Sequence, residues 1–133
     1  MAESSLSGIR VIDLTTVLMG PLATRMLGDH GAEVIRVEST DGDSTRNGLP
    51  RRNEGMSGFS LNLQRNKKSL SIDLKNDRGY EVMLSLVQTA DVIVTNMRSH
   101  ALERLKLDEA SLNLVNPKMI YCRANGFASN GPY

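Results

Sequence analysis

One stretch of the sequence concentrates side chains that are suited to binding phosphate. The basic run Arg65 to Lys68 stands directly before a predicted strand, and Lys75 closes that strand. Lysine and arginine recognise phosphate through their charge and their several hydrogen-bond donors. A basic run of this length is ordinarily a solvated surface segment, however. Spacing alone favours neither interpretation.

A second polar segment follows another predicted strand. Asn96, Met97 and Arg98 come directly after that strand, and Arg104 lies near the end of the next short helix. An asparagine side chain both donates and accepts hydrogen bonds, so it can pair with an adenine edge or an amide. A turn carrying a loop arginine would have the same sequence, so both alternatives stay open.

Several common kinds of site are missing from the sequence. The first predicted strand is followed by TTVLMGP at 15–21, which is neither a G-x-G-x-x-G fingerprint nor a phosphate loop. No cluster of His, Cys and carboxylates has the spacing of a metal site. Cys122 lies in a run that resembles a buried strand, so we expect a core thiol rather than a nucleophile. No catalytic residue and no metal ligand is predicted in this chain.

Length and charge narrow the classes of protein further. The chain has 133 residues, enough for one domain, and its 16 basic and 15 acidic residues leave a net charge of +1. That balance predicts no binding to nucleic acid or to an anionic membrane. No apolar run reaches the ~18 residues of a membrane span, and residues 1–5 lack the features of a signal peptide. The single cysteine suits a reducing compartment. We therefore expect a cytoplasmic location.

Strands that alternate with helices must position these side chains. We expect strands at 9–14, 33–38, 69–74, 91–95 and 118–122, and helices at 21–30, 77–89, 99–105 and 108–115. The alternation predicts an α/β fold, a Rossmann-like, largely parallel sheet with flanking helices. Phe59, Leu61 and Leu63 alternate with polar residues and predict a further edge strand.

Helix boundaries follow from local signals. Pro21 is expected as the first residue of the first helix, and Asp77, Ser99 and Asp108 as caps of the later helices. Parallel sheets bind ligands outside the carboxyl ends of their strands. These ends are the segments 15–20, 39–43, 75, 96–98 and 123–125, which we expect to converge in space.

Taken in order, the segments resemble the N-terminal part of the class III (family III) CoA-transferases, such as formyl-CoA transferase and carnitine CoA-transferase. The similar segments are LSGIRVIDL at 6–14, GP at 20–21, LGDHGAEVIRVE at 27–38, GDSTR at 42–46, NKKS at 66–69, IDLK at 72–75, ADVIVTN at 90–96, GF at 126–127 and GPY at 131–133. Each is weak alone, but the collinear set is specific. Members of this family are much longer, so residues 1–133 would be an incomplete portion of a CoA-binding α/β domain.

The resemblance implies which residues contact coenzyme A. The matching positions are Val17, Leu18, Met19, Ser39, Ile72, Lys75, Asn96, Met97, Arg98 and Arg104. Three of them depart from the family: Ser39 stands where a basic residue is common, Met97 where an aromatic residue is common, and Leu18 where glutamine is frequent. No cofactor would be bound permanently, because coenzyme A or acyl-CoA is the substrate.

The resemblance also implies a reaction and an assembly. CoA-transferases of this family move CoA between carboxylic acids through aspartyl anhydride and thioester intermediates, and they form interlocked homodimers. Their catalytic aspartate would lie beyond the end of this chain, so the chain alone is expected to be inactive. Asp13 and Asp73 are expected within strands, with structural roles.

Two alternatives remain open. An α-methylacyl-CoA racemase shares the fold of this family and would use a downstream His and acidic residue, although the N-K-x-S pattern at 66–69 resembles the transferase branch more. The other alternative is a non-catalytic remnant that only binds CoA.

Overall fold

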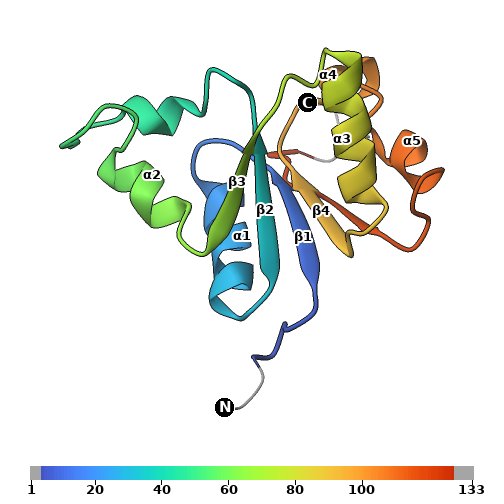
Figure 1. Cartoon of the computed structure of the whole chain (residues 1–133), viewed down its shortest axis with the longest axis horizontal. Helices are drawn as coiled ribbons and strands as arrows, with labels where there is room; N and C mark the ends of the chain where they lie inside the picture. The colour runs from blue at the N-terminus through green and yellow to red at the C-terminus, as the bar shows by residue number, and fades with distance from the viewer. Residues whose placement is uncertain (1–3, 128–133) are drawn as a thin grey trace.

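The computed structural model describes residues 4–127, which form a parallel sheet flanked by helices (Figure 1). The strands are β1 (Arg10–Leu14), β2 (Glu33–Glu38), β3 (Lys67–Ser71), β4 (Val92–Thr95) and β5 (Ile120–Arg123). The helices are α1 (Met19–Asp29), η1 (Ser44–Asn47, a 3-10 turn), α2 (Gly58–Leu63), α3 (Asp77–Val87), α4 (Ser99–Arg104) and α5 (Glu109–Asn113). Every pair of neighbouring strands in this five-stranded sheet is parallel, which confirms the predicted α/β class.

The order of the strands determines where a ligand can enter. The sheet runs β3-β2-β1-β4-β5, so β1 lies at its centre and pairs through Ile12 with Ile35 of β2 and Ile93 of β4. Strands β2 and β3 are added in turn on one side of β1, and β4 and β5 are then added on its other side. In such sheets the reversal of order opens a crevice at the carboxyl ends of the two strands concerned. Here those strands are β1 and β4.

The three central strands of the sheet, β1, β2 and β4, are buried on both faces, as their β-branched residues require. The larger apolar cluster includes Ile12 and Ile93 of the sheet, Met83 and Val87 of α3, and Leu112 of α5. The smaller cluster lies on the other face, where Val11, Val34 and Val94 pack with Leu27 of α1. Helices therefore cover both faces, and the strand ends stay free to carry a site.

The predicted edge strand at Phe59, Leu61 and Leu63 is wrong, because this segment is the helix α2. The Ser57 hydroxyl caps the helix by accepting from the Ser60 amide at 3.0 Å. Ser60 and Leu63, three residues apart, form its buried side, whereas Phe59 and Leu61 are exposed. A segment of about six residues is too short to separate the period of a strand, about 2 residues, from that of a helix, about 3.6 residues.

Several boundaries also differ from prediction. Strand β3 spans 67–71 rather than 69–74, so Asp73 lies outside it, in the turn that leads into α3. Asn76 rather than Asp77 caps α3, because its side chain accepts from the Arg78 amide. Helix α4 begins after Arg98 without a side-chain cap, so Ser99 is its first residue.

Three further predictions concern the cap of α5, the start of α1 and the burial of Cys122. The first is confirmed and the other two are wrong. Asp108 caps α5 as predicted, accepting from the Ser111 amide at 3.1 Å. Helix α1 begins at Met19, so Pro21 is its third residue rather than its first. The core thiol is also wrong: Cys122 is exposed, because β5 is an edge strand of the sheet.

Candidate functional site

The carboxyl ends of β1, β2 and β4 surround a pocket of about 390 Å³. Leu14 of β1 and Glu38 of β2 border it, and its walls include Ser39, Ile72, Lys75 and Met97, four of the residues predicted to contact CoA. These four come from three loops that are far apart in sequence. The predicted convergence of the strand ends is therefore found for this part of the site.

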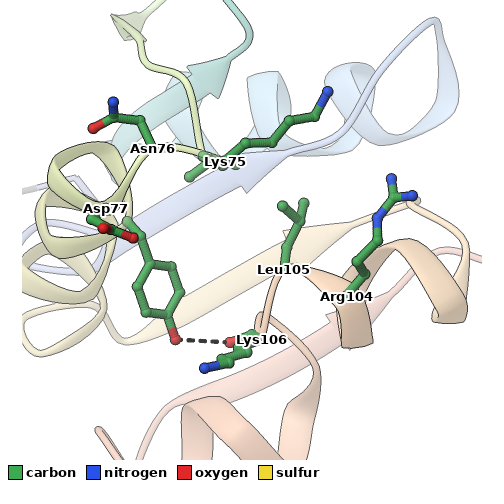
Figure 2. Close-up of a pocket in the computed structure, with 8 residues that line it drawn as sticks. Lys75, Asn76, Asp77, Arg104, Leu105 and Lys106 are labelled. Carbon is green, nitrogen blue, oxygen red and sulfur yellow. Dashed lines mark hydrogen bonds between the residues drawn. The ribbon is translucent and has the colours of Figure 1, made fainter.

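A second pocket, of about 460 Å³, continues from the first between α3 and α4. The two pockets share Leu74, Lys75 and Leu105. Lys75 and Arg104 extend toward the same side of this pocket (Figure 2). Both side chains are exposed, so they keep their charge in contact with water and can meet an anion. The combined groove has an apolar end beside Ile72 and Met97 and a basic end beside Arg104.

The loop between β1 and α1 carries Val17 and Leu18, and Met19 begins α1. These three residues are 53%, 47% and 59% exposed. None of the three lines the groove, although the preceding Thr16 does. Leu18 instead borders a separate shallow apolar pocket beside Phe59 of α2. This loop thus lies next to the groove and presents apolar side chains outward.

Asn96 lies between that loop and β4 and uses its amide to join them. Its Oδ1 accepts from the Thr16 amide at 3.0 Å, and its Nδ2 donates to the Thr16 carbonyl at 2.9 Å. Arg98 lies on the exposed surface at the start of α4 and lines neither pocket of the groove. Contact of CoA with any of the ten predicted residues stays a prediction.

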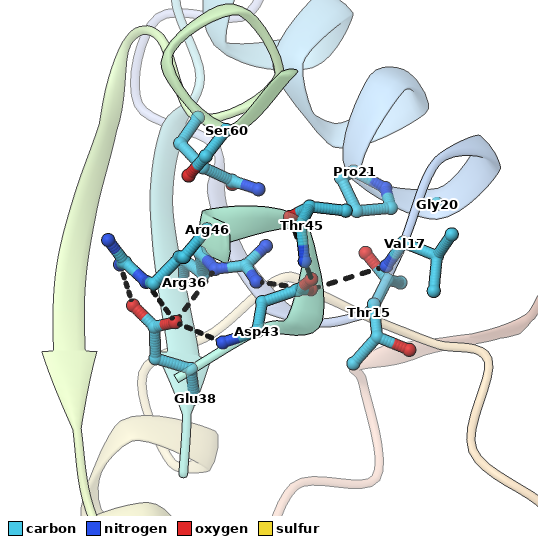
Figure 3. Close-up of polar contacts among 12 residues, drawn as sticks. Thr15, Val17, Gly20, Pro21, Arg36, Glu38, Asp43, Thr45, Arg46 and Ser60 are labelled. Atoms are coloured by element: carbon cyan, nitrogen blue, oxygen red, sulfur yellow. Dashed lines mark hydrogen bonds and ion pairs between the residues drawn. The ribbon is translucent and has the colours of Figure 1, made fainter. Parts of the chain in front are cut away.

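Asp43, a buried carboxylate that the sequence did not single out, lines the groove. It lies within a cluster of polar contacts (Figure 3). Oδ2 of Asp43 accepts from Arg36 Nη2 at 2.8 Å and from the Val17 amide at 3.2 Å. Its Oδ1 accepts from the amide and the hydroxyl of Thr45, both at 2.7 Å. Burial acts to raise the pKa of Asp43, but the hydrogen bonds from Thr45, Arg36 and Val17 outweigh it and hold the pKa below its usual value.

Glu38 joins the same cluster and makes it electrically neutral. Its carboxylate accepts from Arg46 through both Nε, at 2.9 Å, and Nη2, and from the Asp43 amide at 3.2 Å. Arg36 Nε lies 3.8 Å from its Oε2. Burial acts to raise the pKa of Glu38, yet Arg46 and Arg36 lower it overall. In the sequence, the segments LGDHGAEVIRVE at 27–38 and GDSTR at 42–46 contain these residues, but they carried a family resemblance and no role.

The basic residues of the run at 65–68 each pair with a carboxylate, and a phosphate contact of this run stays a prediction. Arg65 Nη2 bonds Asp29 Oδ2 at 2.6 Å, and Lys68 pairs with Glu33. Lys67 is buried against Asp13 at 2.8 Å. These pairs attach β3 and the residues just before it to α1, β1 and β2.

Lys67 and Asp13 form a second buried cluster beneath α1. The Lys67 ammonium also bonds the Pro21 carbonyl, the Thr24 hydroxyl and the Gln64 side chain at 2.8, 2.8 and 3.1 Å. Burial lowers the pKa of Lys67, aided by nearby arginines, and the attraction of Asp13 only partly opposes this. The expected structural role of Asp13 agrees with these contacts, and it lies within β1 as predicted.

Two negative findings apply to residues 4–127. No group of three or more His, Cys, Asp and Glu side chains in this part of the chain could hold a metal ion. None of the helices that the structure describes is long and apolar enough to cross a membrane. The GPY segment at 131–133 lies outside the described residues.

Comparison with known proteins identifies the family. Residues 6–133 match the sequence profile of CoA-transferase family III. The chain belongs to this family. It is 44% identical over 135 residues to the succinate–glutarate CoA-transferase of Agrobacterium fabrum, covering 96% of this chain and 34% of that protein. It is 38% identical over 128 residues to the human succinyl-CoA:glutarate CoA-transferase, covering 96% of this chain and 29% of that protein.

Solved structures agree with this assignment. The crystal structure of a CAIB/BAIF family protein from Brucella suis superimposes with a TM-score of 0.93 at 38% sequence identity. The match covers 99% of this chain and 36% of that protein. The chain thus spans about a third of the length of the relatives it matches. Family III enzymes act on acyl-CoA substrates.

Proposed function

We propose that this chain supplies the CoA-binding part of a CoA-transferase that moves CoA between two carboxylic acids. The observation that carries the proposal is the continuous groove in which Lys75 and Arg104, 29 positions apart, extend toward the same side. A basic end and an apolar end in one groove suit a ligand with phosphates at one end and an uncharged arm at the other. Coenzyme A is such a ligand.

Each part of the groove has a proposed task. Lys75 and Arg104 bind phosphate oxygens through charge-assisted hydrogen bonds, which are stronger than neutral ones. Ile72 and Met97 pack against the pantetheine arm, and the flexible thioether of Met97 adapts to its shape. Asn96 acts mainly on Thr16, because its amide is already bonded there in both directions. Ser39 offers a neutral hydroxyl at the pocket wall.

The complete reaction needs groups that we place elsewhere in a longer protein. An aspartate attacks the acyl-CoA thioester to form a mixed anhydride and release CoA thiolate. The thiolate then attacks the aspartyl carbonyl, which gives an enzyme thioester and frees the donor acid, and the acceptor carboxylate completes the exchange. Dividing the transfer into such covalent steps lowers each barrier. The 133-residue chain is thus an incomplete CoA-binding portion, inactive alone, of a protein that assembles as a homodimer.

The relatives favour the transferase over the racemase alternative. Two of the relatives named above are a succinate–glutarate CoA-transferase and a succinyl-CoA:glutarate CoA-transferase. We therefore propose short dicarboxylic acids as the class of acyl donor and acceptor.

Calorimetric titration with CoA tests the binding proposal. Arg104→Ala should weaken binding by about 1.5–3 kcal/mol, roughly 10- to 150-fold, if the guanidinium meets a phosphate. Arg52→Ala is the matched control, because Arg52 is exposed and lines neither pocket of the groove. Equal affinities for the two variants would remove the case for Arg104. Acyl exchange catalysed by the 133-residue chain itself would overturn its proposed inactivity.

A further inference from the structure

The loop between β1 and α1 holds Val17 in a backbone conformation that valine rarely adopts. Its φ is +69°, in the left-handed region. The Cβ of an L-amino acid crowds the backbone in this region. The conformation is therefore unfavourable for most residues other than glycine, and most of all for those whose Cβ is branched. Val17 as a residue is 53% exposed, so tight packing does not explain its conformation. The restraint must come from contacts to the backbone.

Those contacts come from two sides. The Val17 amide donates to Oδ2 of Asp43 at 3.2 Å, and the preceding Thr16 is joined to Asn96 through both its amide and its carbonyl. Asp43 lies 26 positions after Val17, and Asn96 lies 80 positions after Thr16. The conformation of the loop is therefore imposed by two distant segments, one that follows β2 and one that follows β4.

The two carboxylate oxygens of Asp43 have separate partners (Figure 3). Oδ1 caps the 3-10 turn η1 through Thr45, as any good capping side chain would. Oδ2 faces Val17 and is fixed by Arg36, whose guanidinium is itself buried. A cap alone needs one acceptor oxygen. Oδ2 pairs with the buried Arg36, and its further bond to the Val17 amide is required neither by that pair nor by the cap at η1.

We propose that Asp43 is a positioning residue, which holds the left-handed backbone at Val17 so that the exposed Val17 and Leu18 side chains meet the pantetheine arm of CoA. This inference rests on the proposed CoA binding. Strained backbone is retained where the surrounding structure enforces it, commonly at ligand sites. The loop is well placed for this task, because Thr16 and Asp43 both line the 390 Å³ pocket from which it emerges.

Asp43→Ser keeps the cap at η1 and removes the bond to Val17. It also breaks the buried ion pair with Arg36, a loss that is the same whether residue 17 is valine or glycine. Serine caps turns and helices well, so Thr45 keeps an acceptor, whereas the shorter side chain cannot reach Val17. Loss of the restraint should lower CoA affinity by about 5- to 30-fold, the range that corresponds to the cost of a left-handed non-glycine residue. Thr45→Val is the matched control: it removes a bond to Oδ1, leaves Oδ2 in place, and should leave CoA affinity unchanged.

A second background distinguishes positioning from a general structural effect. Glycine adopts positive φ readily, so in a Val17→Gly chain the restraint matters less. Asp43→Ser should then lower CoA affinity much less than it does beside Val17. Equal losses in both backgrounds would mean that Asp43 acts through overall structure, and this would overturn the proposal.

Amide hydrogen exchange at Val17 reads the restraint without any ligand. In the unmodified chain the Val17 amide should exchange slowly, and in Asp43→Ser it should exchange as a free loop amide does. Fast exchange in the unmodified chain overturns the proposal even if Asp43→Ser fails to fold. If the Val17 amide exchanges slowly but the unmodified chain does not bind CoA, the restraint exists and the proposed function is refuted. The proposed contact between the loop and CoA is then refuted as well.

Discussion

Replacing Lys67 by methionine should destabilise the protein far more than the same change at its neighbour Lys68. The Lys67 side chain is 1% exposed, and its ammonium lies 2.8 Å from the carboxylate of Asp13, whose side chain is fully buried. Methionine has a similar length but no charge. The variant therefore leaves the Asp13 carboxylate buried without its cation.

The expected magnitude follows from that geometry. Removing one partner of a buried ion pair typically costs about 3–5 kcal/mol, because the remaining charge stays out of water. The Pro21 carbonyl and the Gln64 side chain lose a donor as well. Asp13 keeps its bonds from Thr15 and Thr24, at 2.9, 2.5 and 2.7 Å, which moderates the loss. We expect a decrease in the free energy of unfolding within this range.

Lys68→Met is the control. Lys68 pairs with Glu33 on the surface, and its side chain is 71% exposed. Exposed ion pairs contribute about 0–1 kcal/mol, so this variant should stay close to the unmodified chain. The double variant Asp13→Asn with Lys67→Met removes both buried charges and should be more stable than Lys67→Met alone.

Urea unfolding followed by circular dichroism measures all four proteins. The slope of free energy against urea should stay constant, which would show that stability alone has changed. The interpretation fails if Lys67→Met and Lys68→Met differ by less than about 1 kcal/mol, since that result would mean that water reaches the buried pair.

Two further predictions concern acid and a crowded glycine. The pKa values of Glu38 and Asp43 lie below their ordinary 4.5 and 3.8 in the folded chain, so the stability that they contribute should be present above those values and should decrease as pH falls through the lowered ones. Urea unfolding at pH values from about 7 to about 3 measures this loss of stability. In Glu38→Gln the loss should be smaller. A stability that does not change with pH would contradict the prediction. Gly79→Ala should destabilise by about 1–3 kcal/mol despite the helix preference of alanine, because its Cβ would lie 2.1 Å from the Asp73 carbonyl oxygen in the turn before α3. Gly58→Ala, whose Cβ would meet the Pro50 oxygen at 3.7 Å, should be close to neutral. Thermal unfolding measures both variants, and equal melting temperatures would refute the steric argument.

Much of the fold was encoded locally. Runs such as IRVIDL and EVIRVE predict strands because continuous β-branched stretches suit a sheet covered on both faces, and β1 and β2 occupy those positions. Alternation with helices then required parallel pairing, because a crossover returns the chain in the same direction. The cap at Asp108 was equally local, since capping depends on residues three positions apart.

The prediction failed where short segments allow two periodicities. Alternating Phe59, Leu61 and Leu63 fit a strand, yet the Ser57 cap and burial of Ser60 and Leu63 make this segment a helix. Cys122 looked buried because its run is apolar, but β5 is at the edge of the sheet and leaves it exposed. The position of a strand within a sheet is a tertiary property that composition does not report.

The sequence by itself thus determined the class of fold, the order of its elements, and the strand ends that approach a common groove. Only the tertiary structure decided that Lys67 is a buried partner of Asp13, 54 positions away, and that Asp43 restrains Val17. The physical reason is that the interaction energy of a charged group depends on its exposure to water and on the groups around it. Contacts between distant segments of the chain decide both.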